Sequence, residues 1–475
     1  MALRVRHHHV RGIGRGRARV GWVWAPNLWA ESPGQPSQIA LLAQFDAGLF
    51  LDSTPACSST TRGGSHRSGC APSWPVAPPG YPRSPAGSSG PAPARADRCG
   101  CVTPRSTLPV TSPCSSLGPG EDLLGWAGGR VVHPLDRRRP LWRADVISGL
   151  PPGRFGLLVV VHHAVANGLI GVAITTALLD PDPATRPTDP AADRSPDPIP
   201  PPPTQRALVA DHLGSLRATL TAAARRLPRL PAAVRRGARH LRDVAPELRA
   251  PAPTTSLPHR VGPSRRLVAV QVPLAELRAA RQAHHATIND LLLAAVTTGL
   301  RVLLHARGDT LEGVVLRASF PVGELPGQHA GMLLVGLPVG EPDPLRRLAT
   351  ITTTTTAMKT RVRTGGGDVF DILHLPRPLA RLAVRWMRRS AHRHINLFVT
   401  NVPGPARPLW LAGARMLDAV PVAPLTADVP VGVAALSYAG TLAVSVNVDA
   451  AVTDVDILAR GIDRGFTDLG VTAGR

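Results

Sequence analysis

The sequence is poor in aromatic residues and in lysine. Phe, Trp and Tyr make up 4% of its 475 residues, and Lys359 is the only lysine. Its 54 basic residues are therefore almost all arginine, and with 32 acidic residues they give a formal net charge of +22. Such an excess can attract a protein to anionic surfaces. Without a helix-turn-helix pattern or an aromatic–basic motif, however, we expect no binding to nucleic acid.

Cysteines and long apolar runs are also scarce. The five cysteines lie between positions 57 and 114, an odd number without a Cys-x-x-Cys pair, so we predict neither a disulfide framework nor a zinc site. No run of about twenty apolar residues is free of polar breaks, so no membrane-spanning helix is expected. The basic N-terminus lacks the apolar core of a signal peptide. We therefore expect a cytoplasmic protein.

Composition divides the chain into four parts. Residues 1–36 are basic and irregular, 37–180 form an N-terminal domain, 181–264 a Pro-rich linker with crossover helices, and 265–475 a C-terminal domain. The crossover helices are basic and amphipathic. Two interpretations stay open for them, a solvated connection between the domains or a contact with a membrane surface.

One tract inside the N-terminal domain, residues 57–117, consists mainly of Ser, Pro, Gly, Arg and Cys. Such a composition buries too little apolar surface to offset the entropy of ordering. We expect this tract to be irregular, either disordered or read in a shifted frame through GC-rich DNA. Sequencing the coding DNA tests the second explanation, which fails if no alternative frame encodes amphipathic sequence.

Strands and helices alternate in the rest of the chain. Period-2 patterns predict strands in RFGLLVVV, RRLVAVQVPL, VVLRASFPVG, MLLVGLPVG and NLFVTNV, and a hairpin through Ala439 and Gly440. Apolar spacing predicts a buried helix that starts with a capping box at Thr287 and Asp290 and ends near Gly308. This alternation indicates a mixed α/β fold.

Two adjacent histidines, His162 and His163, follow the strand RFGLLVVV. Neighbours in a strand point to opposite faces, so we expect one ring in the core and the other at a cleft. The turn that leads to Asn167 and Gly168 lies at the carboxyl end of the strand, where α/β sheets often bind ligands. An imidazole there can take up a proton near neutral pH. A purely structural pair stays the alternative, and no third residue nearby favours metal binding.

The segment HHAVANG resembles the HHxxxDG signature of CoA-dependent acyltransferases. HPLDRRRPLWRADVISGLPPGRF, ATINDLLLAAVTTGLR, LRASFPVGELPG, NLFVTNVPGP and LSYAG are similar, in order, to the bacterial wax ester synthase/diacylglycerol acyltransferase family, and FDAGLFLDSTPA resembles its opening segment. The resemblance covers about 40–56 and 118–470. It implies two chloramphenicol-acetyltransferase-like α/β domains, joined by a long helical crossover, with a tunnel between them.

The resemblance also implies a mechanism, in which His163 is the general base and His162, Asn167 and Gly168 complete the catalytic motif. The base would take the proton from the hydroxyl of a diacylglycerol or a long-chain alcohol, and the oxygen would attack the thioester of acyl-CoA. No cofactor or metal is implied. Such lipid substrates lead us to expect contact with the inner membrane or with lipid inclusions. The residues that match the family's substrate-site motifs are Asn289, Asp290, Pro140, Leu141 and Trp142.

Asn167 departs from the motif, which has Asp at this position. Asn keeps hydrogen bonding but loses the charge, and an arginine partner left buried and unpaired would cost on the order of several kcal/mol. We therefore expect reduced activity that Asn167→Asp raises. Two alternatives stay open. One is an inactive or weakly active, lipid-associated remnant of the family; the other is a condensation-type acyl or peptidyl transferase, which the lack of an adjacent carrier domain disfavours.

Overall fold

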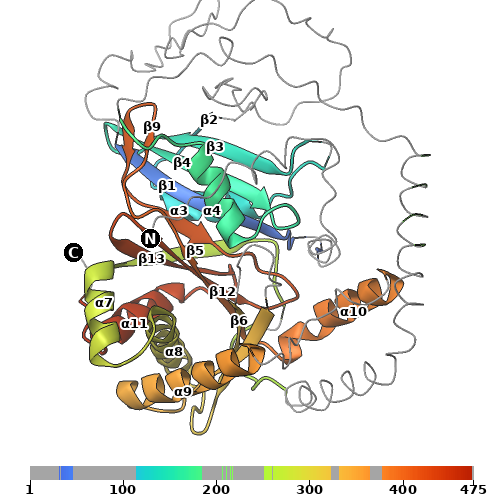
Figure 1. The fold of residues 1–475 in the computed structure, drawn as a ribbon, viewed down its shortest axis with the longest axis vertical. Helices are drawn as coiled ribbons and strands as arrows, with labels where there is room; N and C mark the ends of the chain where they lie inside the picture. Colours follow the sequence, from blue (N-terminus) through green and yellow to red (C-terminus); the bar gives the residue numbers. More distant parts are fainter. Residues whose placement is uncertain are drawn as a thin grey trace, which may run out of the picture.

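The computed structural model describes five stretches of the chain, which contain two β-sheets and the helices packed on them (Figure 1). These stretches are residues 31–46, 114–183, 251–322, 331–363 and 377–472, without residues 33, 138 and 259 and with single helical positions at 206, 210, 214 and 217. Apart from those four positions, the predicted crossover helices lie outside the described residues, as does the irregular tract up to residue 113.

The first sheet has seven strands in the order β2-β3-β4-β1-β10-β9, with β11 also paired to β1. Strand β4 lies between β3 and β1 and is antiparallel to both. Its alternate residues enter two different cores, because helix α3 covers one face of the sheet and helix α4 the other. The bounds are β1 Gln38–Asp46, β2 Cys114–Ser116, β3 Trp142–Ser148, β4 Arg154–His162, β9 Trp410–Leu411, β10 Ala414–Met416 and β11 Val420–Val422, with α3 at Leu123–Val131 and α4 at Gly168–Ala177.

The second sheet has six strands in the order β5-β13-β12-β8-β6-β7. Strand β8 lies parallel to both β12 and β6, while the other pairs are antiparallel. Helices α8, α9 and α11 cover one face of this sheet (Figure 1). The strand bounds are β5 Arg265–Pro273, β6 Leu316–Val322, β7 Gly331–Leu337, β8 Leu397–Pro403, β12 Val431–Tyr438 and β13 Thr441–Asp449. The helix bounds are α7 Leu274–Ala283, α8 Ile288–Ala306, α9 Pro344–Arg363, α10 Arg377–Ser390 and α11 Val455–Thr467, with a 3₁₀ turn at Ala391–Arg393.

Three strands of the first sheet come from the C-terminal half of the chain. Residues 410–422 leave the second sheet after β8, supply β9, β10 and β11 to the first sheet, and return to form β12. Strand β11 also packs against β12 and β13, and the side chain of Asn447 on β13 donates a hydrogen bond to the Ala423 carbonyl at 2.7 Å. The two sheets are therefore joined by shared chain as well as by packing.

Helix α8 is the central helix of the second core. Thr287 caps it, accepting a hydrogen bond from the Asp290 amide while the Asp290 carboxylate accepts one from the Thr287 amide, which is the capping box predicted from the sequence. Gly299 lets α11 approach closely, because a Cβ on Gly299 would lie 2.8 Å from the Leu458 carbonyl. Among the described helices, α8 alone is long and apolar enough to span a membrane, and most of it is buried inside the protein.

The mixed α/β fold expected from the sequence is confirmed, and the predicted strands and buried helix appear at the expected positions. The hairpin turns through Ala439 and Gly440, which both have positive φ. Two segments expected to be irregular are ordered at their ends. Residues Cys114–Ser116 pair with β3 to form β2, and residues 31–37 make side-chain and backbone contacts with both sheets.

Candidate active site

The histidine pair lies at the carboxyl end of β4, fixed by the strands on either side. The His162 amide donates a hydrogen bond to the Leu141 carbonyl at 2.9 Å, and the His163 amide donates one to the Ser37 carbonyl at 2.8 Å. Leu158 and Val160 face α3, whereas Val159 and Val161 face α4. By this alternation, position 162 belongs to the α3 face and position 163 to the α4 face.

His162 is a buried histidine, with 2% of its surface exposed. Its Nδ1 accepts a hydrogen bond from the Ala164 amide at 2.9 Å. The neutral ring must therefore carry its proton on Nε2, and Nε2 lies 2.9 Å from Oε1 of Glu31. This ring thus closes the turn after β4 on one side and faces a carboxylate on the other.

His163 is partly exposed. Burial lowers the pKa of its ring below the ordinary histidine value of 6.5, and the neighbouring His162 lowers it further, while a hydrogen bond with its own backbone acts in the opposite direction. The net shift favours the neutral imidazole at neutral pH. A neutral imidazole can take up a proton, which is what a general base needs.

Asn167 and Gly168 begin helix α4. The Asn167 side chain accepts a hydrogen bond from the Ile170 amide at 2.8 Å, so Asn167 is the N-cap of this helix. Among the described residues, the Ile170 amide is the one hydrogen-bond partner found for the Asn167 side chain. Gly168 touches the second sheet, because a Cβ there would lie 2.6 Å from Cγ2 of Val402 on β8. The turn from His163 to Gly168 therefore lies at the junction of the two sheets.

Asn289 is on the opposite face of β8. Its Oδ1 accepts a hydrogen bond from Nδ2 of Asn401 at 2.7 Å. Asn401 shares its face of the strand with Leu397 and Val399, which belong to the core under α8, whereas Val402 packs against the core that contains α4. The Asn289–Asn401 hydrogen bond thus joins β8 to α8 next to Val402, the residue of β8 that contacts Gly168 on the other face.

Asp290 is almost fully buried, with 1% of its surface exposed. Its Oδ2 accepts hydrogen bonds from the amide and hydroxyl of Thr287, at 2.8 and 2.7 Å, and its Oδ1 accepts one from the Thr355 hydroxyl of α9 at 2.7 Å. Both carboxylate oxygens are therefore engaged inside the protein. Asp290 caps α8 and joins it to α9.

The sequence matches two family models. The "wax ester synthase/diacylglycerol acyltransferase catalytic domain" matches residues 112–292, and the "WS/DGAT C-terminal domain" matches residues 327–470. A Mycobacterium tuberculosis protein named "probable diacyglycerol O-acyltransferase tgs1" is 31% identical over 349 residues, which cover 71% of this chain and 73% of that protein. The chain belongs to the wax ester synthase/diacylglycerol acyltransferase family.

Other family members agree with this assignment. A second diacylglycerol O-acyltransferase homologue of Mycobacterium tuberculosis is 30% identical over 381 residues, covering 75% of this chain and 77% of the homologue. The solved structure of a wax ester synthase/diacylglycerol acyltransferase from Marinobacter aquaeolei superposes with a TM-score of 0.57 at 20% identity, covering 94% of this chain and 97% of that chain. At that identity, the structural likeness shows a shared fold.

The Pro140–Trp142 segment of the family motif lies beside the histidine pair. Leu141 contributes the carbonyl that binds the His162 amide, and Trp142 begins β3 opposite Val161. Trp142 is partly buried against the core that contains α4. Pro140 stands just before β3, where its carbonyl accepts a hydrogen bond from the Trp142 amide at 2.8 Å.

Sequence reasoning missed two residues that contact the motif residues. Glu31 lies in the segment predicted to be an irregular basic extension. Its partner His162 is more than a hundred residues away in the chain, so no local sequence pattern predicts the contact. Asn401 lies in the predicted strand NLFVTNV, where a polar residue in an apolar run is a signal that could have indicated its role. Both depend on tertiary pairing.

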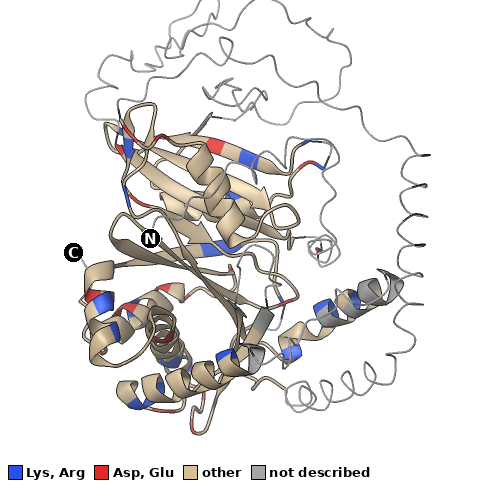
Figure 2. Ribbon diagram, in the orientation of Figure 1, with Lys and Arg blue, Asp and Glu red and all other residues tan. Residues whose placement is uncertain are grey.

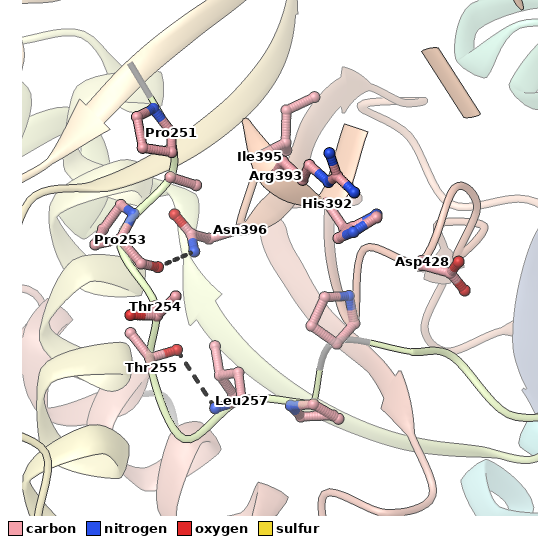
Figure 3. Close-up of a pocket in the computed structure, with 13 residues that line it drawn as sticks. Pro251, Pro253, Thr254, Thr255, Leu257, His392, Arg393, Ile395, Asn396 and Asp428 are labelled. Atoms are coloured by element: carbon pink, nitrogen blue, oxygen red, sulfur yellow. Dashed lines mark hydrogen bonds between the residues drawn. The ribbon is translucent and has the colours of Figure 1, made fainter. Parts of the chain in front are cut away.

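Two cavities lie elsewhere in the described structure. One of about 220 Å³ is lined by Pro253, Leu257, Arg393 and Asn396 among others, at the amino end of β8 (Figure 3). The other, of about 530 Å³, lies between α3, β5 and α11. None of the predicted site residues lines either cavity. Among the described residues, no group of three or more His, Cys, Asp or Glu side chains is placed to hold a metal ion.

Proposed function

We propose that this chain is an O-acyltransferase that moves a fatty acyl group from acyl-CoA to the hydroxyl of a diacylglycerol or a long-chain alcohol, with His163 as the general base. One observation carries the proposal. A partly exposed imidazole with a lowered pKa stands at the carboxyl end of the central strand, in a turn whose other end touches the second sheet. Family membership supplies the reaction class.

The proposed step needs only one proton acceptor from the protein. The neutral ring of His163 takes the hydroxyl proton as the acceptor oxygen attacks the thioester carbon. The C–S bond then breaks, and CoA leaves as a thiolate, which can take the proton back from the imidazolium. A positioned base contributes about 10² to 10⁴ in rate. A thiol has a reference pKa of about 8.5, so the thiolate needs little help to leave.

In this proposal the other motif residues hold the backbone around His163 in place. Asn289 holds β8 through Asn401, and Asp290 holds the start of α8, so that Val402 stays against Gly168. Leu141 and Trp142 fix the strand beside the histidines. The carboxylate that the family motif has at position 167 is replaced here by the uncharged cap Asn167.

An assay of CoA release tests the proposal. Acyl-CoA is supplied with either diacylglycerol or hexadecanol, and the released thiol is measured for the wild type, for His163→Ala, and for His305→Ala as a matched control. His305 is an exposed histidine of α8. We expect His163→Ala to lose about 10² to 10⁴ of the rate and His305→Ala to keep it. Equal loss in both, or none in either, contradicts a catalytic role for His163. No release from folded wild type would favour the non-catalytic remnant.

We further propose that helix α10 contacts an anionic lipid surface. Its sequence, RPLARLAVRWMRRS, contains five arginines and no acidic residue. In Figure 2, blue arginine segments mark the described part of this helix. Leu382 and Trp386 are 64% and 57% exposed, and the exposed Arg385 and Arg389 lie on the same side, three and seven positions from Leu382. Apolar and cationic side chains on one exposed helix face are typical of interfacial helices.

Vesicle co-sedimentation tests this contact. We expect binding to vesicles that contain an anionic lipid, weaker binding to purely zwitterionic vesicles, and loss of binding in Trp386→Glu. The exposed Leu345 of α9 offers a control, because Leu345→Glu alters an apolar surface residue outside α10. Equal binding of all three proteins would rule out α10 as the contact.

A further inference from the structure

The Glu31 carboxylate lies against three nitrogen atoms, which belong to Ser37, Arg137 and His162. Its Oε1 lies 2.9 Å from Nε2 of His162 and accepts a hydrogen bond from the Ser37 amide at 2.9 Å. Its Oε2 is paired with Arg137. Only 15% of the Glu31 side chain is exposed. Burial alone would raise the pKa of Glu31, but these contacts outweigh it and lower the pKa, so the group is an anion at neutral pH.

The segment that carries Glu31 is anchored on the second sheet. The Gly34 carbonyl accepts a hydrogen bond from Nη2 of Arg265 at 2.7 Å, and Nε2 of Gln35 donates one to Oδ1 of Asp428 at 2.7 Å. The Ser37 carbonyl then accepts the His163 amide at 2.8 Å. Glu31 therefore belongs to a short strap, residues 31–37, that fixes the backbone of the histidine pair from one side.

The contacts of His162 give Glu31 a route to His163. Since Nδ1 of His162 accepts a hydrogen bond from the Ala164 amide, the ring proton is on Nε2, which lies 2.9 Å from Oε1 of the Glu31 carboxylate. The carboxylate thus favours the one tautomer that can close the turn through Ala164. His163 lies between His162 and Ala164 in the chain. The hydrogen bond from the Ala164 amide to the His162 ring therefore fixes the turn that carries His163.

We propose that Glu31 is a positioning residue for the histidine pair, a proposal that rests on the proposed function of His163 as base. Among the described residues, Glu31 is the carboxylate that contacts the pair, and position 167 contributes an uncharged helix cap instead. The acidic group that orients this turn is therefore supplied from the N-terminal strap.

Kinetics of Glu31→Gln, Glu31→Asp and the exposed-residue control Glu312→Gln test the proposal. We expect Glu31→Gln to lower kcat about tenfold, because a misplaced catalytic group costs rate rather than binding, with little change in the KM for acyl-CoA. Loss of the negative charge also makes the His163 imidazole harder to protonate, so the acid limb of the pH profile moves to lower pH. The side chains that face the Glu31 carboxylate are those of His162 and Arg137. Glu31→Asp keeps the charge and should restore the position of the limb.

A double variant separates positioning from general destabilisation. In a His162→Gln background, the effect of Glu31→Gln on kcat should disappear, because both changes break the same contact. Additive losses, an unchanged pH limb, or a fall in kcat that simply follows the unfolded fraction measured by thermal melting would overturn the proposal.

A readout independent of activity keeps this test apart from the test of the reaction. In ¹⁵N-histidine NMR spectra, the signals that disappear in His162→Gln belong to His162. We expect the Nε2–H tautomer in the wild type, and a shift of the His162 Nε2 resonance in Glu31→Gln, because the neighbouring negative charge is lost. An unchanged His162 resonance in Glu31→Gln counts against the proposal, whereas an inactive wild type with the expected resonance shift counts only against the proposed function.

Discussion

The two sheets are built from the chain in different ways. The second takes all six strands from residues 265–449, and a single large core joins it to α8, α9 and α11. The first combines strands from residues 38–162 with three short strands from 410–422, and it has a separate core on each face. The histidine pair is in the first sheet, so the residues proposed for chemistry lie in the part assembled from distant segments.

The two regions also differ in how exposed their polar side chains are. In the second, buried polar side chains bind one another, as Asp290 binds Thr287 and Thr355, and Arg347 binds the Thr298 hydroxyl. In the first, His162 is likewise bound, by the Ala164 amide, but the next residue, His163, is partly exposed and has a lowered pKa. The second sheet with its helices is thus a scaffold, and changes there should affect stability, whereas changes near α4 should affect rate.

The largest effect expected is on stability, from Gly461→Ala in α11. A Cβ at Gly461 would lie 2.7 Å from Cα of Gly299, so α8 and α11 would have to separate. Overpacking of this kind costs about 3 kcal/mol, which chemical denaturation would measure. The rate per folded molecule should stay that of the wild type. As a control, Gly470→Ala changes a glycine with open space around it but positive φ, so a smaller loss is expected from backbone strain.

Gly168→Ala should lower the rate more than the stability. Its Cβ would meet Val402 at 2.6 Å, which displaces the turn that carries His163 from β8. We expect a loss of about tenfold in kcat/KM, with thermal melting little changed. Adding Val402→Ala removes the clash and should restore part of the rate. If the double variant is no faster than Gly168→Ala, contact between the sheets does not position the turn.

The pH profile tests the role of His163 in the first sheet without mutation. Because the pKa of His163 lies below 6.5, the base stays neutral down to that pH, and the acid limb of kcat/KM should fall below 6.5. In the same range, the unfolded chain binds a proton that the folded ring resists, so stability also falls as the pH drops through this window. An acid limb at or above 6.5 would mean that another group controls the rate.

The smallest effect expected is that of Asn167→Asp. Asp can keep the cap on Ile170 and adds a negative charge at the start of α4, worth about 0.3–1 kcal/mol in stability. The charge also favours the imidazolium that forms on His163 during proton transfer, so turnover should rise by about two- to threefold. Steady-state rates at saturating acyl-CoA measure this, and an unchanged or lower turnover refutes it.

Features with local signals could be predicted from the sequence. The capping box at Thr287, the turn at Ala439 and Gly440, and the buried strand before His162 all follow from residues within one element. Strand alternation predicted one buried ring in the histidine pair without saying which, and the structure buries His162 and leaves His163 partly exposed.

Features that depend on tertiary pairing could not be predicted. Strands β9, β10 and β11 are two or three residues long and take their form from pairing with β1 and with each other. Glu31 and Asn401 acquire a partner only when distant elements meet. The cap formed by Asn167 is different, because it is a local contact with Ile170 that was not predicted from the sequence.

The strands at 410–422 constrain how this protein can be made. During synthesis the long strand β1 leaves the ribosome well before its partner β11. The edge of β1 that will pair with β11 therefore has unpaired backbone donors and acceptors until the rest of the chain is made. Exposed edges of that kind invite association between chains. Expression of the N-terminal half alone should therefore give aggregates, and adding the C-terminal half as a separate polypeptide during translation should recover soluble protein.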